Sequence, residues 1–243
     1  MKRIALISLV IMVLLGSLIN AQAAGTYKIG DTFTFGHFEQ DGNEANGAEP
    51  IWWIVIDVKD DGSLVLISSL VLAFMPFHDS FNDVAWATCS LRTWLNHDFL
   101  YDAFDYKEME KIQTNTVVTP DNPIYKTPGG GIVEDKVYLL SFNEITTEYG
   151  CDGTYCAYFS NPHKLRAFPT DFAKAALLEW WGGDEIAFAI SLDETGAAIW
   201  WLRTMSIDMT CACTVPTHGI ILDSSAYSNI GPQGVRPVIC IKP

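Results

Sequence analysis

The residues best suited to chemistry lie near the end of the chain, in the polar stretch between Arg203 and Gly234. Amide, hydroxyl, carboxylate and aromatic side chains on loops suit a polar ligand such as a sugar, because they combine hydrogen bonding with a flat apolar face. An ordinary solvated loop is the alternative interpretation. The residues that we expect to contact such a ligand are Trp201, Asp208, His218, Asp223, Tyr227 and Asn229.

Two tryptophan pairs, Trp52-Trp53 and Trp200-Trp201, add aromatic surface that a sugar ring could stack on. Neighbouring residues of a strand point to opposite faces of the sheet. One member of each pair should therefore lie in the core, while the other is covered by a helix or exposed. An exposed member is a candidate stacking platform.

Motifs for hydrolysis are absent from the sequence. The five histidines are scattered, and no Gly-x-Ser-x-Gly or His-Glu-x-x-His string occurs. The acidic segments around Asp57 and Asp121 match no recognised calcium loop. We assign no catalytic residue and expect no metal and no cofactor, although a hydrolase remains an alternative.

Six cysteines offer either disulfides or soft-metal chemistry: Cys89, Cys151, Cys156, Cys211, Cys213 and Cys240. An even number of cysteines in an exported protein favours disulfides. Cys151 and Cys156 flank a turn-prone Asp-Gly-Thr-Tyr segment, which favours that pair. A bond from Cys240 to Cys211 or Cys213 is a further candidate. No Cys-x-x-Cys or His-x-x-x-His spacing supports a zinc site.

Three arginines, Arg92, Arg203 and Arg236, each lie inside an apolar motif. An unpaired buried charge is costly. We therefore expect each guanidinium to pair with a carboxylate or with loop carbonyls. The functional alternative is that one of them reaches an anionic ligand.

Strand patterns open the chain. Residues 32–38 alternate phenylalanines with smaller side chains, and the runs 51–58 and 64–68 flank Lys59-Asp60-Asp61-Gly62. An Asp-Gly turn between two β-rich runs predicts a hairpin. Strand patterns return in the last third, at residues 199–203, 219–222 and 235–241.

Helical patterns occupy the middle of the chain. One helix begins at Ser90, which we expect to cap it, and capping boxes at Asp105-x-x-Glu108 and Ser141-x-x-Glu144 open two more. Residues 119–131 should form a long loop, 136–140 a strand, and 170–181 a helix that ends at Gly182-Gly183. Strands, then helices, then strands predict a single α+β domain: a twisted antiparallel sheet with packed helices and long loops.

Several motifs occur along the chain in a fixed order: Gly30-Asp31-Thr32, Pro50-Ile51-Trp52-Trp53, Ser90-Leu91-Arg92-Thr93-Trp94-Leu95-Asn96, Lys136-Val137-Tyr138-Leu139-Leu140, Trp200-Trp201-Leu202-Arg203 and Gly234-Val235-Arg236-Pro237. This series resembles the DUF6273 family, a domain of unknown function in secreted and surface proteins of anaerobic bacteria. The resemblance covers about residues 27 to 242. The two closing motifs are also similar to those of C-type-lectin-like and formylglycine-generating-enzyme folds, which implies a C-type-lectin-like architecture.

The second of these resemblances raises the alternative of a copper-dependent oxidase, because two cysteines bind copper(I) in the formylglycine-generating enzyme. That enzyme places four residues between its cysteines, shortly before the Gly-x-Arg strand. Cys151 and Cys156 have the spacing but lie too early, whereas Cys211 and Cys213 have the position but not the spacing. Neither pair meets both conditions. The Glu-Pro-Asn, Gln-Pro-Asp and Trp-Asn-Asp motifs of calcium-dependent lectins are also absent.

Residues 1–23 match a cleavable signal peptide: a basic start, an apolar run from Ile4 to Leu18, and the small-x-small site Ala21-Gln22-Ala23. The mature domain would span residues 24–243, outside the cytoplasm, with no further membrane span. Loss of Lys2 and Arg3 changes the formal net charge from −14 to −16. This acidity disfavours nucleic acid as a partner. The sequence therefore predicts a secreted binding or interaction domain with a glycan or cell-envelope ligand, and an extracytoplasmic enzyme is the alternative.

Overall fold

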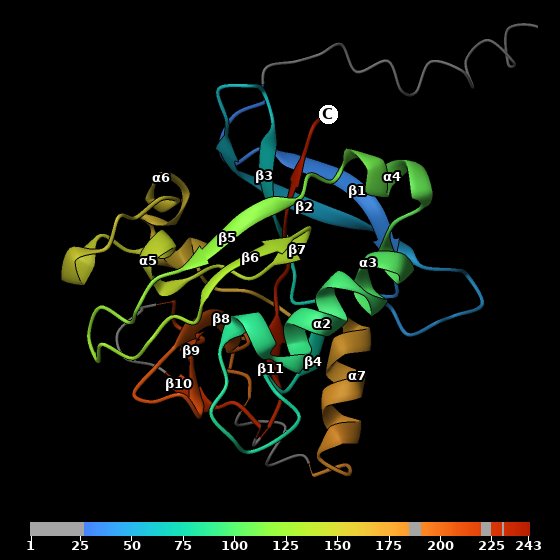
Figure 1. Cartoon of the computed structure of the whole chain (residues 1–243). Coiled ribbons are helices and arrows are strands. Elements are labelled where there is room, and N and C mark those ends of the chain that lie inside the picture. Colours follow the sequence, from blue (N-terminus) through green and yellow to red (C-terminus); the bar gives the residue numbers. More distant parts are fainter. Residues whose placement is uncertain (1–26, 185–190, 220–224, 230) are drawn as a thin grey trace, which may run out of the picture.

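The computed structural model describes residues 27–184, 191–219, 225–229 and 231–243 (Figure 1). The predicted signal peptide, Asp223 and nearly all of the predicted strand 219–222 lie outside these ranges. Within them the chain combines helices with antiparallel sheets, which confirms the predicted α+β class. No described helix has the length and apolarity needed to cross a membrane.

The first sheet has the strand order β1-β2-β3-β12-β7, with every neighbouring pair antiparallel. The predicted strand 32–38 and the predicted hairpin are confirmed, because β2 pairs with β3 on either side of the Asp-Gly turn. The predicted strand 136–140 contains only the two residues of β7. The strands are β1 (Thr32–Phe38), β2 (Glu49–Val58), β3 (Leu64–Ser68), β7 (Val137–Tyr138) and β12 (Val238–Ile241).

The second sheet has the order β10-β9-β8-β11-β4, and a separate two-stranded ribbon pairs β5 with β6. The predicted strand 235–241 is divided between the two sheets, because Arg236-Pro237 separates β11 from β12. The bounds are β4 (Ala73–Met75), β5 (Asn115–Thr119), β6 (Gly131–Asp135), β8 (Trp200–Met205), β9 (Cys211–Val215), β10 (Ser225–Tyr227) and β11 (Gln233–Val235).

Short helices connect and cover these sheets. The α-helices are α2 (Ser90–Asn96), α3 (Asp98–Ala103), α4 (Tyr106–Lys111), α5 (Phe142–Ile145), α6 (Cys156–Phe159) and α7 (Asp171–Trp180). The 3-10 helices are η1 (Trp86–Thr88), η2 (Glu148–Gly150) and η3 (Pro162–Lys164).

The helix termini follow the sequence signals with one exception. Both predicted capping boxes are present, at α4 and α5. Helix α7 ends before Gly182 and Gly183, which adopt φ of 62° and 81°. The exception is α2, where Ser90 is already helical and the cap is Cys89, whose Sγ accepts from the Arg92 N–H at 3.3 Å.

One cluster of buried side chains contains residues of both sheets and of the helices between them. Of the first tryptophan pair, Trp53 is fully buried and Trp52 is 54% exposed, as the alternation of a strand predicts. Both members of the second pair, Trp200 and Trp201, are fully buried. Strand β8 is an inner strand of its sheet and is covered on both faces, so neither ring reaches the surface.

Candidate functional site

A cleft of about 680 Å³ opens on the surface of the described part of the chain. It lies where α2, the start of α3, the end of α7, the segment after β4 and the turn after β10 meet. The indole-bearing residues Trp94 and Trp180 line it together with polar side chains. The lining residues are Met75, Pro76, His78, Asp79, Thr88, Ser90, Thr93, Trp94, Asp98, Trp180 and Asn229. We call this site the aromatic cleft.

Helix α2, which carries Trp94, is held in place by a buried charge. The Asp135 carboxylate is buried and accepts from the Arg92 Nε at 2.8 Å and from the Trp86 indole at 2.9 Å. At the other end of α2, the Asn96 amide bonds the backbone of β7 through the Val137 N–H and C=O. These bonds fix the Trp94 side of the cleft. They also confirm a structural role for Arg92.

Helix α7 places Trp180 on the opposite wall. Its N-cap is Thr170, which accepts from the Ala173 N–H at 3.1 Å, and Leu177 on its inner face is fully buried. Residues adjacent on a helix point about 100° apart, so a Trp-Trp pair there cannot face the core together. Trp181 is half-buried, and Trp180 remains 53% exposed at the cleft.

The segment after β4 forms the floor and presents His78. The His78 Nδ1 accepts from the Ser90 backbone N–H at 3.2 Å. A backbone N–H can only donate, so the neutral imidazole carries its proton on Nε2. The Nδ1 also lies 3.6 Å from the Asp79 Oδ1. With Nδ1 accepting from Ser90, the Nε2–H of the neutral ring is a hydrogen-bond donor. The backbone N–H of His78 donates to the Ser228 carbonyl at 2.9 Å, and this bond holds the turn after β10 against the floor.

Trp201 lies beneath this floor. Its indole N–H donates to the Met75 carbonyl at 2.8 Å, and its ring contacts Phe77 with centroids 5.6 Å apart. The expectation that Trp201 contacts a ligand directly is therefore wrong in this structure, because the ring is fully buried. It supports the floor instead.

The other residues that we expected at a ligand surface are distributed as follows. Asn229 lines the aromatic cleft, and its Oδ1 is buried with no hydrogen-bond partner in the described part of the chain. Tyr227, two residues earlier, is 52% exposed and contacts the ring of Phe81 at 6.2 Å. Asp208 is exposed, its Oδ1 accepts from the Thr210 N–H at 2.8 Å and from the Thr210 hydroxyl at 2.6 Å, and it does not line the aromatic cleft.

His218 does not belong to this group. It is exposed beside the segment of η3, where the Arg166 Nε donates to the Thr217 carbonyl at 3.0 Å and Gly219 lies against Pro162. Asp223 lies outside the described residues. Of the six expected residues, the structure thus brings Asn229 into the cleft and places Tyr227 close by along the chain.

Sequence reasoning missed most of the cleft wall. Trp94 matched the inward face of a helix, and Trp180 was not singled out. Adjacent residues of a helix also point in different directions, so one member of Trp180-Trp181 could have been predicted to be exposed. No local signal links His78 and Asp98 to Asn229, because they meet only through the tertiary fold.

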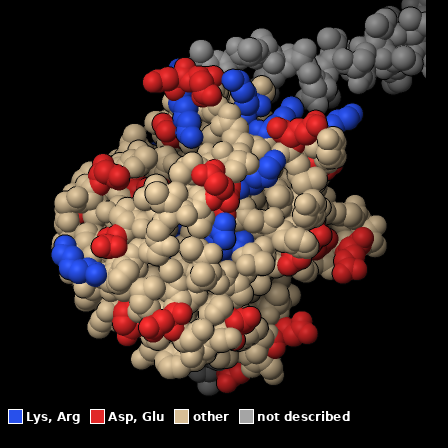
Figure 2. All heavy atoms as spheres, viewed as in Figure 1, with Lys and Arg blue, Asp and Glu red and all other residues tan. Residues whose placement is uncertain are grey.

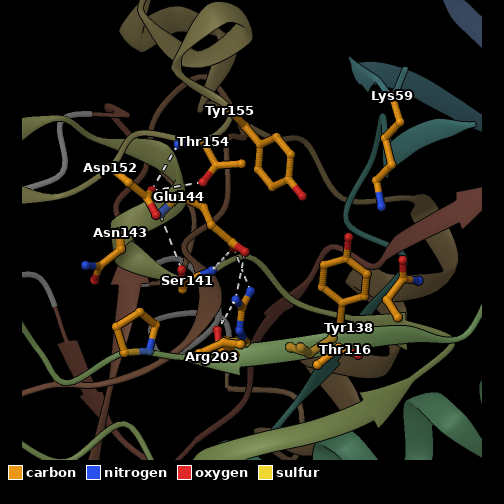
Figure 3. A pocket seen from close by; sticks show the side chains of 14 residues that line it. Lys59, Thr116, Tyr138, Ser141, Asn143, Glu144, Asp152, Thr154, Tyr155 and Arg203 are labelled. Carbon is orange, nitrogen blue, oxygen red and sulfur yellow. Dashed lines mark hydrogen bonds and ion pairs between the residues drawn. The ribbon is translucent and has the colours of Figure 1, made fainter. Parts of the chain in front are cut away.

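A second, more polar cavity of about 260 Å³ lies between β5, α5 and the loop before α6 (Figure 3). Its charged centre is an ion pair in which the Arg203 Nη1 and Nη2 meet the Glu144 carboxylate at 2.6 and 2.7 Å. The guanidinium also donates to the Leu139 and Val118 carbonyls and to the Thr119 hydroxyl. All its donors are used, so Arg203 is not available to an anionic ligand.

Two tyrosines complete the wall of this polar cavity. Figure 3 shows the hydroxyl ends of Tyr138 and Tyr155 on the same side as Lys59. Burial raises the pKa of both phenols, so both stay protonated at neutral pH. The Glu144 carboxylate, besides meeting Arg203, accepts from the Ser141 N–H at 2.7 Å and thereby caps α5. The Arg203–Glu144 pair is therefore a satisfied structural network, although the Oδ1 of Asn143, which also lines this cavity, is buried with no hydrogen-bond partner among the described residues.

Arg236 is buried without a carboxylate partner among the described residues. Its Nε donates to the Ser68 carbonyl at 2.8 Å, and its guanidinium lies 5.3 Å from the centre of the Trp200 ring. Burial lowers the pKa of Arg236 to about 10, which still leaves the side chain charged at neutral pH. This residue pairs with a carbonyl and an aromatic face, and it bridges the two sheets.

All six cysteines are free thiols in the structure, so none of the predicted disulfides is formed in it. The Cys240 Sγ contacts the Gln113 side chain, whereas the Cys213 Sγ contacts the Met205 carbonyl, and the two belong to different sheets. Burial raises the pKa of every one of the six thiols, for Cys89 and Cys213 to about 12. Protonated thiols are poor copper ligands. The Cys151–Cys156 bond stays a prediction.

A family model described as Domain of unknown function (DUF6273) matches residues 61–243. The match covers most of the chain, so the chain belongs to that family. Among the curated proteins nothing matches the chain, and the same holds for the solved structures.

Proposed function

We propose that this DUF6273 protein is an exported, non-catalytic glycan-binding domain and that the aromatic cleft is its binding site. The observation that carries the proposal is that one cleft is lined by both Trp94 and Trp180 together with polar side chains. Sugar rings combine apolar faces with many hydroxyls, and a site of indoles beside hydrogen-bonding groups complements both.

A binding role is favoured over catalysis by the state of His78. With Nδ1 accepting from the Ser90 N–H, the neutral ring presents a hydrogen-bond donor at the cleft. Trp201 and Phe77 pack beneath the floor and make it rigid. A rigid, preorganised surface loses little conformational entropy when a ligand binds.

Export is supported by the basic, apolar and small-x-small segments of residues 1–23. N-terminal sequencing of the protein recovered from the culture medium should begin at Ala24. Recovery of the uncut chain only from the cell would contradict this part of the proposal.

We also infer a C-type-lectin-like architecture. Its support is that the two closing motifs meet in the fold, where Gly234 on β11 pairs in parallel with Trp200 on β8. An experimental structure tests the inference. Failure of its sheets to superimpose on C-type-lectin-like domains would refute it.

The test of glycan binding is a calorimetric screen of the mature domain against soluble oligosaccharides and peptidoglycan fragments, with and without EDTA. Two tryptophans of almost equal exposure make a matched pair of variants: Trp180 at the cleft is 53% exposed, and Trp52 on β2 is 54% exposed. Trp180→Ala should weaken binding about tenfold, roughly 1.4 kcal/mol, while Trp52→Ala should leave it unchanged. EDTA should have no effect. No binding to any member of the panel, or equal loss in both variants, would contradict the proposal.

A further inference from the structure

The charges of the aromatic cleft all have one sign. Of the described residues that line it, two are charged, and both are aspartates: Asp79 and Asp98. Their side chains are 72% and 59% exposed. In Figure 2 the lower part of the molecule, where Figure 1 places the end of α7, likewise shows Asp and Glu but no Lys or Arg on the face drawn.

Each of these two aspartates also has one carboxylate oxygen that accepts no hydrogen bond from the described residues. Asp79 accepts from the Ser80 hydroxyl at 2.8 Å through Oδ1, and Asp98 contacts the His97 ring at 2.9 Å through Oδ1. The Oδ2 atoms of both have no hydrogen-bond partner in the described ranges. The cleft therefore presents two exposed carboxylate oxygens that can accept hydrogen bonds from a ligand.

Two indoles beside two carboxylates form a site that attracts cations. The faces of tryptophan rings carry negative potential, and an ammonium group placed over them is stabilised further when carboxylates lie within a few ångströms. An anionic sugar such as a uronate would meet repulsion from both aspartates. A neutral sugar could donate hydroxyl groups to the aspartates but would leave their negative charge without a counter-charge.

We infer that the ligand of the aromatic cleft is a glycan that carries protonated amino groups, such as a de-N-acetylated amino sugar. The inference rests on the proposed function, since it names the class of sugar that the same site takes. The ammonium lies between the indoles and the aspartates, and its N–H groups donate to the free Oδ2 atoms.

The probes that test this are the tetramers of glucosamine and of N-acetylglucosamine, in which each nitrogen is a protonated amine or an uncharged acetamide, respectively. At an ionic strength of about 0.01 M, the glucosamine tetramer should bind about tenfold more tightly. Because salt screens exposed charges, most of this preference should vanish at about 1 M.

Variants separate a local effect from the overall acidity of the protein. The double change Asp79→Asn and Asp98→Asn should abolish the preference and leave the affinity for the neutral tetramer unchanged. The control is Asp60→Asn, which removes an exposed charge in the β2–β3 turn, away from the cleft residues. It should retain the preference.

The outcomes distinguish this inference from the proposed function. Equal affinity for the two tetramers, or an equal loss of preference in Asp60→Asn, overturns the cationic ligand but leaves glycan binding standing. If neither tetramer binds but other neutral glycans do, the cationic ligand is likewise overturned and glycan binding still stands. Only the absence of binding across the whole panel removes the proposed function as well.

Discussion

The Arg203 side chain is 2% exposed, and its guanidinium pairs with a carboxylate and donates to two carbonyls. The expectation that an arginine in an apolar motif must pair is met here and at Arg92. The sequence could not identify Glu144 as the partner, because 59 residues separate the two. The sequence around Glu144 indicates only that this residue caps α5 in a capping box, and it gives no sign of a second role as the partner of Arg203.

Replacing Glu144 tests how much this pair contributes to stability. Glu144→Gln keeps an oxygen to cap the Ser141 N–H but leaves Arg203 buried with no counter-charge. The free energy of unfolding should fall by about 3 kcal/mol, as in other buried pairs that lose one partner. Denaturation in urea measures this loss. The exposed Glu148, four residues on, provides the control: Glu148→Gln should change stability by less than about 0.5 kcal/mol. Equal effects would mean that the pair is not the source of stability.

At the scale of the elements, sequence signals that act within a few residues were sufficient to predict where several helices and strands begin and end. The Asp-Gly hairpin, both capping boxes and the Gly-Gly end of α7 form as predicted, because each depends on hydrogen bonds or backbone angles within one turn. Pairings between distant segments could not be predicted from the sequence. The ribbon β5–β6 closes across an 11-residue loop, and Arg236-Pro237 directs one apolar run into two sheets.

Gly36 shows how a single residue joins two elements. It lies at an irregularity of β1 with φ of 71°, and its N–H donates to the Glu108 side chain of α4 at 3.1 Å. A Cβ at this position would lie 2.5 Å from the Phe104 ring and 2.6 Å from the Ala103 carbonyl. Only glycine allows β1 to approach the chain between α3 and α4 so closely.

Gly36→Ala should therefore destabilise the fold more than its backbone angle alone requires. The left-handed conformation costs roughly 1–2 kcal/mol for a residue with a Cβ, and the steric overlap adds about 1–3 kcal/mol. Gly42 has a similar φ of 79° with nothing within 4 Å of a Cβ, so Gly42→Ala should show the first cost only. Denaturation midpoints compare the two, and equal losses would contradict the close approach.

At the scale of the whole molecule, the aromatic cleft exists only because distant segments converge. Residues 75–79, 94–98, 180 and 229 come from separate stretches of the chain and meet around one floor. Loop composition drew attention to Asn229, which lines the cleft, and to Tyr227, two residues before it. It could not show that Trp201 supports the floor from below, because burial is decided by the packing of β8 between its neighbours.

The central claim is that a glycan contacts Trp94 and Trp180 in this cleft. The most direct measurement is the indole N–H region of the ¹H–¹⁵N NMR spectrum, with single Trp→Phe variants for assignment, during titration with the tetramers of glucosamine and N-acetylglucosamine. The indole signals of Trp94 and Trp180 should move in a saturable manner, while those of Trp52 and Trp53 stay fixed. Movement of the Trp52 signal, or no movement of any indole signal with either sugar, would contradict the claim.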